Sequence, residues 1–183
     1  MRSLPRHFNK DKKGVAAVEF ALILPVMLTL FFGVTEISQA LSARAAVTNV
    51  AAVTADLVAQ KSVMTGGEIS NVFSAAEAIL YPFDTTAAHI KVSSIIYDTV
   101  SKSLTSGKVS WSCAKRDTAK SEGDTVTLPD GLMTEGGSVI ISEIVYDYSS
   151  PVSKLVVGAA SMKNTFYTKP RRVMSIAKPA SCS

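Results

Sequence analysis

The sequence predicts an α+β fold in which a long N-terminal helix spans a membrane, continues into a stem and packs on a small antiparallel β-sheet. Three observations predict this arrangement. The chain of 183 residues has an apolar run at 15–34, it has no Gly or Pro between Val34 and Gly66, and β-branched and aromatic residues alternate with polar ones after Pro82. A long helical pattern followed by segments of period two is typical of an α+β domain.

The segment 15–34 is the predicted transmembrane helix. Glu19 is the only ionisable group among its twenty residues, and twenty helical residues extend about 30 Å, the thickness of a bilayer's hydrocarbon core. Ahead of it, the basic leader 1–14 carries five Lys and Arg against one Asp. Positive charge beside the first apolar segment keeps that side cytoplasmic. We therefore expect a single-pass protein with a cytoplasmic N-terminus and an exported C-terminal part.

Glu19 needs an explanation, because a carboxylate inside a membrane helix costs about 2.5 to 3.5 kcal/mol on insertion scales. The simpler alternative is that its side chain snorkels to the headgroups. Glu19 follows Gly14 by five residues, stands directly before Phe20, and is followed by Pro25 in the same apolar helix. A basic leader, a Gly, Glu-Phe and an apolar helix resemble the processing site of type IV prepilins. The stretch from Gly14 to Pro25 resembles the TadE-like family of tight-adherence (Tad/Flp) pilus assembly proteins.

This resemblance implies that a prepilin peptidase cuts between Gly14 and Val15, leaving Glu19 as the fifth residue of the mature chain. The new ammonium group of Val15 would pair with Glu19 of a neighbouring subunit and offset its burial, and Phe20 is the second expected assembly residue. The resemblance implies a minor pseudopilin of the bacterial inner membrane, either retained there or incorporated in an extracellular pilus. Its expected partners are prepilin peptidase, other pilins or pseudopilins, the pilus assembly platform and membrane lipid.

Alternatives remain open at this point. The related TadF and TadG proteins share the resemblance, although the lack of a large extra domain disfavours the longer TadG-type chains. A secretory signal peptide could end at Ala45, where the sequence offers an Ala-x-Ala site. The exported part could also be a periplasmic binding module unrelated to pili. The mature N-terminus separates these hypotheses: Val15 for a pseudopilin, Met1 for a plain anchor and Ala46 for a cleaved signal peptide.

The helix should continue through a stem at 35–65 before a periplasmic α+β domain at 66–183. Pro25 removes one backbone hydrogen bond, so we expect a kink or a locally unwound turn near it. The stem carries an apolar stripe at three- and four-residue spacing that should pack on the domain: Val47, Val50, Thr54 and Leu57. Its other faces carry alanines, which would allow another helix to approach closely: Ala40, Ala43, Ala46, Ala51 and Ala55.

The periplasmic domain should begin with a second helix. Thr65 and Glu68 have the spacing of a capping box, an amphipathic pattern follows to Tyr81, and Pro82 ends it. The strand pattern then predicts five β-strands, at 89–97, 108–113, 138–148, 162–168 and 172–177. The polar, turn-rich stretch 114–137 should be the most mobile part, and 151–160 fits either a short helix or an irregular connection.

The residues that carry chemistry are few. Cys113 and Cys182 are both on the exported side, and in an oxidising periplasm two well-separated cysteines more often pair than stay free. Their spacing matches no metal site. The histidines are His7 in the leader and His89 at a strand start, so the exported part can build neither a Ser-His-acid triad nor a two-histidine metal site. We therefore expect no enzyme activity, cofactor or metal.

The charge distribution argues against a nucleic-acid partner. The chain has a net charge of +4, from 19 Lys and Arg against 15 Asp and Glu. The leader holds five of these bases and one of the acids, so the rest of the chain has 14 of each. Nucleic-acid binding relies on a basic face, and only Lys169, Arg171 and Arg172 cluster in the exported part. We expect a small solvated patch there.

Overall fold

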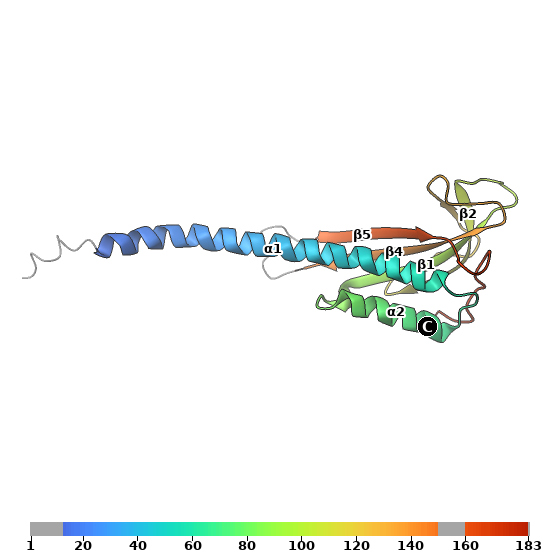
Figure 1. Cartoon of the computed structure of the whole chain (residues 1–183), viewed down its shortest axis with the longest axis horizontal. Helices are drawn as coiled ribbons and strands as arrows, with labels where there is room; N and C mark the ends of the chain where they lie inside the picture. The colour runs from blue at the N-terminus through green and yellow to red at the C-terminus, as the bar shows by residue number, and fades with distance from the viewer. Residues whose placement is uncertain (1–12, 150–159, 183) are drawn as a thin grey trace, which may run out of the picture.

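The computed structural model describes residues 13–149 and 160–182, in which one long helix runs into an α+β domain (Figure 1). Its helices are α1 (Lys13–Ala59), α2 (Gly66–Leu80) and the short 3-10 helix η2 (Thr85–Ala87). The described strands are β1 (Ala88–Tyr97), β2 (Ser106–Lys115), β3 (Thr125–Thr127), β4 (Ser138–Tyr148) and β5 (Ala160–Thr168). They form one antiparallel sheet of order β3-β2-β1-β4-β5. The predicted α+β fold is confirmed.

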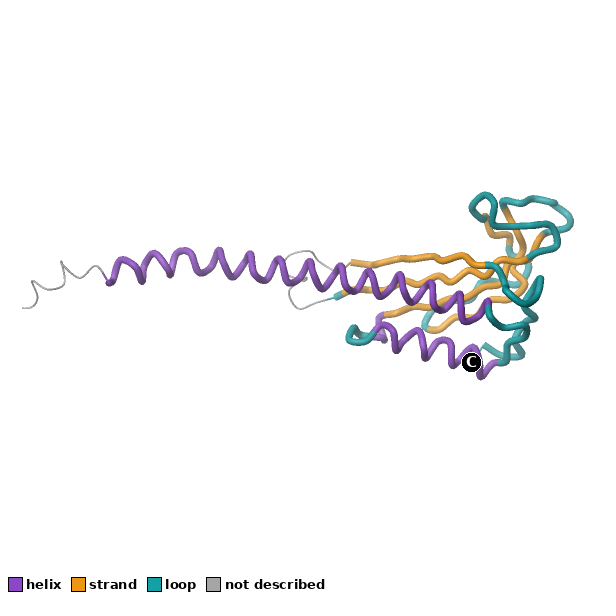
Figure 2. The backbone as a smooth tube through the Cα atoms, in the orientation of Figure 1, coloured by secondary structure: helices purple, strands orange, loops and turns teal. Residues whose placement is uncertain are grey.

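Helices α1 and α2 share one hydrophobic core with the sheet, and both lie along its strands (Figure 2). Alternation along the strands turns one set of apolar side chains toward the helices. Side chains from both helices and from the sheet are almost completely buried in this core, among them Val47 and Val50 from α1, Ile69 and Phe73 from α2, and Ile90, Trp111, Ile140 and Ile144 from the sheet. Burying one such side chain contributes about 1.5 to 3 kcal/mol.

The second half of α1 packs as its apolar stripe predicts. Val47, Val50 and Thr54 are at most 1% exposed, and Leu57 is partly buried. Three of the alanines on the other faces are also fully buried: Ala43, Ala51 and Ala55. Small side chains let backbones approach closely, and here that closeness serves the packing of α1 on α2 and the sheet of its own domain.

Helix α2 begins at the predicted capping box. The Glu68 N–H donates to Thr65 Oγ1 over 3.3 Å, and the Thr65 N–H donates to Glu68 Oε2 over 2.9 Å. Lys61 Nζ lies 2.7 Å from Glu68 Oε1. The hydrogen bond from Lys61 and those from Thr65 lower the pKa of Glu68 from 4.5 to about 2. The helix start therefore prefers an ionised Glu68.

A Glu68→Gln variant should be less stable than the wild type only where Glu68 is ionised. Because its pKa is lower in the folded state, this stabilisation is complete above about pH 5.5 and is lost as the pH falls from about 4.5 toward 2. We expect the difference in Tm between wild type and variant to shrink over that range. Glu135→Gln is the control, since Glu135 has no ion pair within the described residues. A Tm difference that stays constant down to pH 2 contradicts the prediction.

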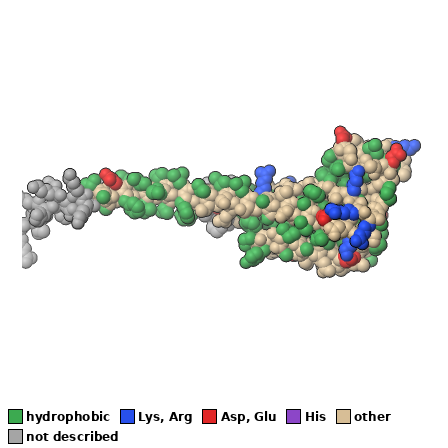
Figure 3. All heavy atoms as spheres, in the orientation of Figure 1, with side chains coloured by type: hydrophobic (Ala, Val, Ile, Leu, Met, Phe, Trp, Pro, Cys, Tyr) green, Lys and Arg blue, Asp and Glu red, His purple; other side chains and the backbone are tan. Residues whose placement is uncertain are grey.

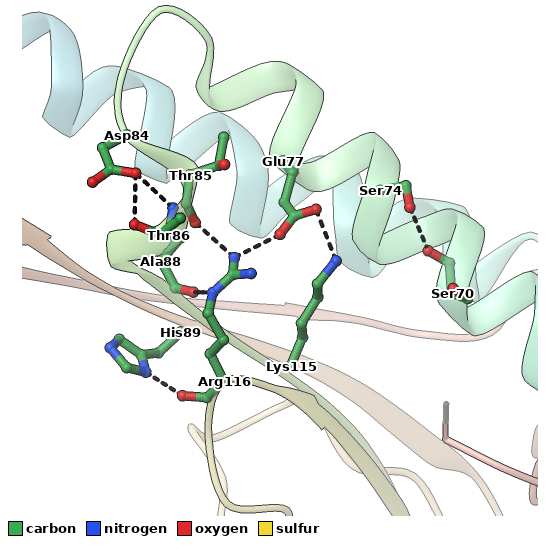
Figure 4. A network of polar contacts seen from close by, with 10 residues as sticks. All are labelled: Ser70, Ser74, Glu77, Asp84, Thr85, Thr86, Ala88, His89, Lys115 and Arg116. Atoms are coloured by element: carbon green, nitrogen blue, oxygen red, sulfur yellow. Dashed lines mark hydrogen bonds and ion pairs between the residues drawn. The ribbon is translucent and has the colours of Figure 1, made fainter.

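An ion-pair network joins the C-terminal half of α2 to the sheet (Figure 4). Arg116 Nη2 lies 2.6 Å from Glu77 Oε1 and donates to the Thr85 carbonyl at 2.6 Å, and Lys115 Nζ lies 2.8 Å from Glu77 Oε2. Burial alone would raise the pKa of Glu77, but the hydrogen bonds from Lys115 and Arg116 hold it below its ordinary value. His89, at the start of β1, contacts the Arg116 carbonyl, so it takes part in a structural contact at a strand end.

The turn-rich stretch 114–137 contains more regular structure than its sequence predicts, and its mobility stays a prediction. Its first two residues extend β2, and Thr125–Thr127 forms β3 against residues 106–108. Leu128 and Met133 are 3% exposed and pack in a second apolar cluster on the opposite face of the sheet. The sequence signal for this packing was the presence of these two apolar residues among polar turn residues.

The predicted strand at 172–177 is wrong. These residues bend across the far end of α1, where the Arg171 N–H donates to the Ala59 carbonyl over 2.9 Å. The Ile176 carbonyl accepts from the Trp111 indole N–H, also over 2.9 Å. A backbone group that forms one of these hydrogen bonds is not free to pair with a neighbouring strand. Pro170, just before the segment, also has no N–H to donate to the sheet. The ambiguous segment 151–160 lies, except for Ala160, outside the described residues.

Candidate membrane and assembly segment

The first half of α1 projects from the domain as an apolar rod (Figure 3). Its large hydrophobic side chains, from Val15 to Val34, are between 38% and 71% exposed. Consecutive residues such as Leu22, Ile23 and Leu24 point in directions about 100° apart, so the rod is apolar on all sides. A helix of this kind is stable only inside a membrane or among other helices. By length and composition, α1 contains one stretch that can cross a membrane.

The threonine hydroxyls in and next to this rod are satisfied within the helix. The Thr29 hydroxyl donates to the Pro25 carbonyl over 2.8 Å, and the Thr35 hydroxyl donates to the Phe32 carbonyl over 2.9 Å. Such internal bonds are what lipid requires of a spanning segment. Residues 13–59 form one continuous helix with Pro25 inside it, so of the two expected forms of disturbance the structure leaves the kink, since losing one N–H keeps the neighbouring hydrogen bonds intact. The kink stays a prediction.

The predicted processing and assembly residues lie in the first two turns of α1. Val15 and Glu19 are four residues apart, which places them on the same helix face. Glu19 and Phe20 are exposed, and Glu19 makes no hydrogen bond or ion pair with any residue that the structure describes. A side chain added at Gly14 would meet no atom within 4 Å. Packing in the described chain therefore explains neither the glycine nor the carboxylate.

A second carboxylate of α1, Glu36, marks where the helix enters the domain. Glu36 is 3% exposed and accepts a hydrogen bond from the Tyr148 hydroxyl at 3.0 Å. Tyr148 is 5% exposed and ends β4. The sequence signal was that Glu36 is the first ionisable residue after the apolar run. The contact fixes how far the apolar rod extends beyond the domain.

Cys113 and Cys182 lie at disulfide-bonding distance, with a sequence separation of 69 residues. Cys113 is fully buried in β2, so the bond holds the C-terminal segment against the sheet. That segment crosses the start of α2, where a side chain at Gly66 would collide with Ser181. Within 13–149 and 160–182, no group of three or more His, Cys, Asp or Glu side chains could hold a metal ion.

An apolar N-terminal helix that carries one carboxylate in its second turn and ends in an α+β domain fits a single-pass membrane protein and is consistent with a pilin-like fold. Residues 14–56 match the family model of the TadE-like proteins, which confirms the resemblance over the apolar rod and most of the stem. No curated protein and no solved structure matches the chain. The TadE-like segment indicates involvement in a Tad pilus system, and this family is structural rather than catalytic.

Proposed function

We propose that this chain is a minor pseudopilin or assembly protein of a Tad-type pilus system. The segment 15–34 holds it in the bacterial inner membrane, with the leader in the cytoplasm and the α+β domain in the periplasm. The observation that carries the proposal is the TadE-like match, which begins at Gly14 and continues along a helix whose apolar side chains have no covering in the described chain. Covering must come from lipid and from neighbouring helices.

The proposed mechanism starts with prepilin peptidase, which cuts between Gly14 and Val15. The cut creates an ammonium group on the helix face that carries Glu19. An ammonium and a carboxylate from different subunits, at the same membrane depth, neutralise each other in the low-dielectric interior. Phe20 packs beside this pair. The helix then associates with other pilins or pseudopilins and with the pilus assembly platform. The charge pair sets its register against the neighbouring helix.

A specific observation argues against the signal-peptide alternative. The Ala-x-Ala site at 43–45 lies inside α1, and Ala43 is fully buried in the core of the domain. Cleavage after Ala45 would remove Ala43 from the core and Glu36 from its bond to Tyr148. The proposal therefore keeps α1 in one piece after maturation.

The deciding experiment is the N-terminal sequence of the full chain purified from cells that contain an active prepilin peptidase. We expect it to begin at Val15, and a Gly14→Val variant to begin at Met1. Gly33→Val is a matched control, because a side chain at either glycine of α1 meets no atom within 4 Å. The control should be cleaved normally. A wild-type chain that begins at Met1 would support a plain anchor carrying a binding module. A chain that begins at Ala46 would support a cleaved signal peptide.

A further inference from the structure

About half of the charged side chains of the domain form ion pairs within the chain. The ion pairs of Lys and Arg among described residues are Lys61–Glu68, Lys91–Asp117, Lys115–Glu77, Arg116–Glu77, Lys120–Glu143, Arg171–Asp56 and Lys178–Glu122. Among the exposed side chains that make no ion pair with any residue in the described ranges, two groups lie in or beside the edge strands of the sheet: the bases Lys163, Lys169 and Arg172, and the acids Asp124, Asp130 and Glu135. These unpaired charges are available to a partner.

The two groups lie in segments of opposite charge. The segment 160–172 has four bases and no acid, and the segment 121–137 has four acids and no base. The first contains β5 and the residues that follow it, which we call the basic edge. The second contains β3 and its flanking loops, which we call the acidic edge. The sheet order β3-β2-β1-β4-β5 places these strands at opposite edges.

Strand register places the two edges at the same height along the molecule. Through β4, Thr168 at the end of β5 is level with Ser94 of β1. Through β2, Thr125 at the start of β3 is level with Ile96 of β1. Two residues along a strand correspond to about 7 Å. Because the strands run along α1 (Figure 1), two copies with parallel α1 helices can bring opposite edges together by a sideways shift alone.

The basic edge also has an apolar contact surface. A groove of about 370 Å³ runs between α1 and β5, and its lining includes Val53, Phe166, Tyr167 and Arg171. The Phe166 side chain is 39% exposed. An exposed aromatic residue with charges around it is the composition expected of an interface with an apolar centre and a polar rim.

We propose that the basic edge of one copy of this chain docks against the acidic edge of the next copy. Pairing of two basic edges would bring like charges together, which costs free energy, so the contact is between unlike edges. An interface of this kind leaves one free edge at each end and can add further copies. The inference depends on the proposed function only in that the copies stand parallel in one membrane.

The test uses the full chain in membrane vesicles, with a photo-crosslinking amino acid in place of Thr165. Thr165 is exposed on β5. We expect crosslinks to residues 121–137 of a second copy. The double variants Lys169→Glu with Arg172→Glu, and Asp130→Lys with Glu135→Lys, should each reduce crosslinking about three- to tenfold. Combining all four substitutions in one chain, or mixing the two double variants, should restore it, which also shows that the variants fold.

Two comparisons make the outcome specific. The control for the single variant Lys169→Glu is the double variant Asn71→Glu with Ser74→Glu, which changes the net charge by the same amount. This control adds two exposed acids on α2 and should leave crosslinking unchanged. Crosslinks to β5 of the second copy, or the absence of restoration in the four-substitution chain, would overturn the proposal. A Gly14→Val chain should still crosslink through its edges, so failure of the processing hypothesis is distinguishable from failure of this one.

Discussion

A Glu19→Ala chain should insert into the membrane normally but enter the pilus assembly at about one tenth of the wild-type level or less. Insertion should not suffer, because the substitution removes a group that costs about 2.5 to 3.5 kcal/mol inside lipid. Assembly should suffer, because the ammonium group of Val15 in the neighbouring subunit loses its counter-charge and stays buried without a partner. A loss of about 1.4 kcal/mol already corresponds to a factor of ten. The measurement is the fraction of chain recovered with assembled material.

Two further variants separate charge from shape and from folding. Glu19→Gln keeps the size of the side chain and loses its charge, so it should behave as Glu19→Ala does. Glu36→Gln changes a second carboxylate of α1. This carboxylate accepts a hydrogen bond from the Tyr148 hydroxyl inside the domain. The substitution should lower the free energy of unfolding by about 1 to 3 kcal/mol and leave pairing between subunits unaffected. Normal incorporation of the Glu19→Gln chain would refute the charge pair.

Replacing Cys113 and Cys182 together by alanine should lower the free energy of unfolding by about 4 kcal/mol. The bond closes a loop between residues 69 apart, and a loop of that length restricts the unfolded chain by about this amount. Alanine is preferred to serine because Cys113 is fully buried and a hydroxyl there would lack a place for its hydrogen bonds. Urea unfolding in detergent can be followed by the fluorescence of Trp111, the single tryptophan of the chain.

The reduced wild type is the control for this effect. Once dithiothreitol has opened the disulfide, the wild type and the double variant should unfold at nearly the same urea concentration. A double variant that loses less than about 1 kcal/mol would show that the C-terminal segment is held mainly by other contacts, such as the bond from Trp111 to the Ile176 carbonyl.

Local patterns predicted most of the fold. The capping box of Thr65 and Glu68, the end of α2 near Pro82 and the bounds of β4 follow from signals within a few residues of each element, and the structure confirms them. The strand at 172–177 failed for a related reason. Its β-branched residues fit a strand locally, but the far end of α1 accepts from the Arg171 N–H directly before it, and the Trp111 indole donates to the Ile176 carbonyl within it.

Contacts between distant residues were out of reach of the sequence alone. Glu36 and Tyr148 are 112 residues apart, and the positions of the basic and acidic edges depend on the strand order. No local signal fixes either one, because register is decided when whole strands pair. In the membrane segment, by contrast, the sequence alone was enough to single out the candidate residues. Gly14 and Glu19 stand out in the sequence because the packing of the described chain does not account for them.

The unbroken course of α1 has a mechanical consequence. Its 47 residues make a shaft of about 70 Å, with one half in lipid and the other clamped in the domain. A membrane helix commonly leans by about 20°, and such a lean carries the far end of the shaft about 24 Å sideways. Packing against neighbouring helices and the thickness of the bilayer together set this lean, and therefore steer where the domain meets its neighbours.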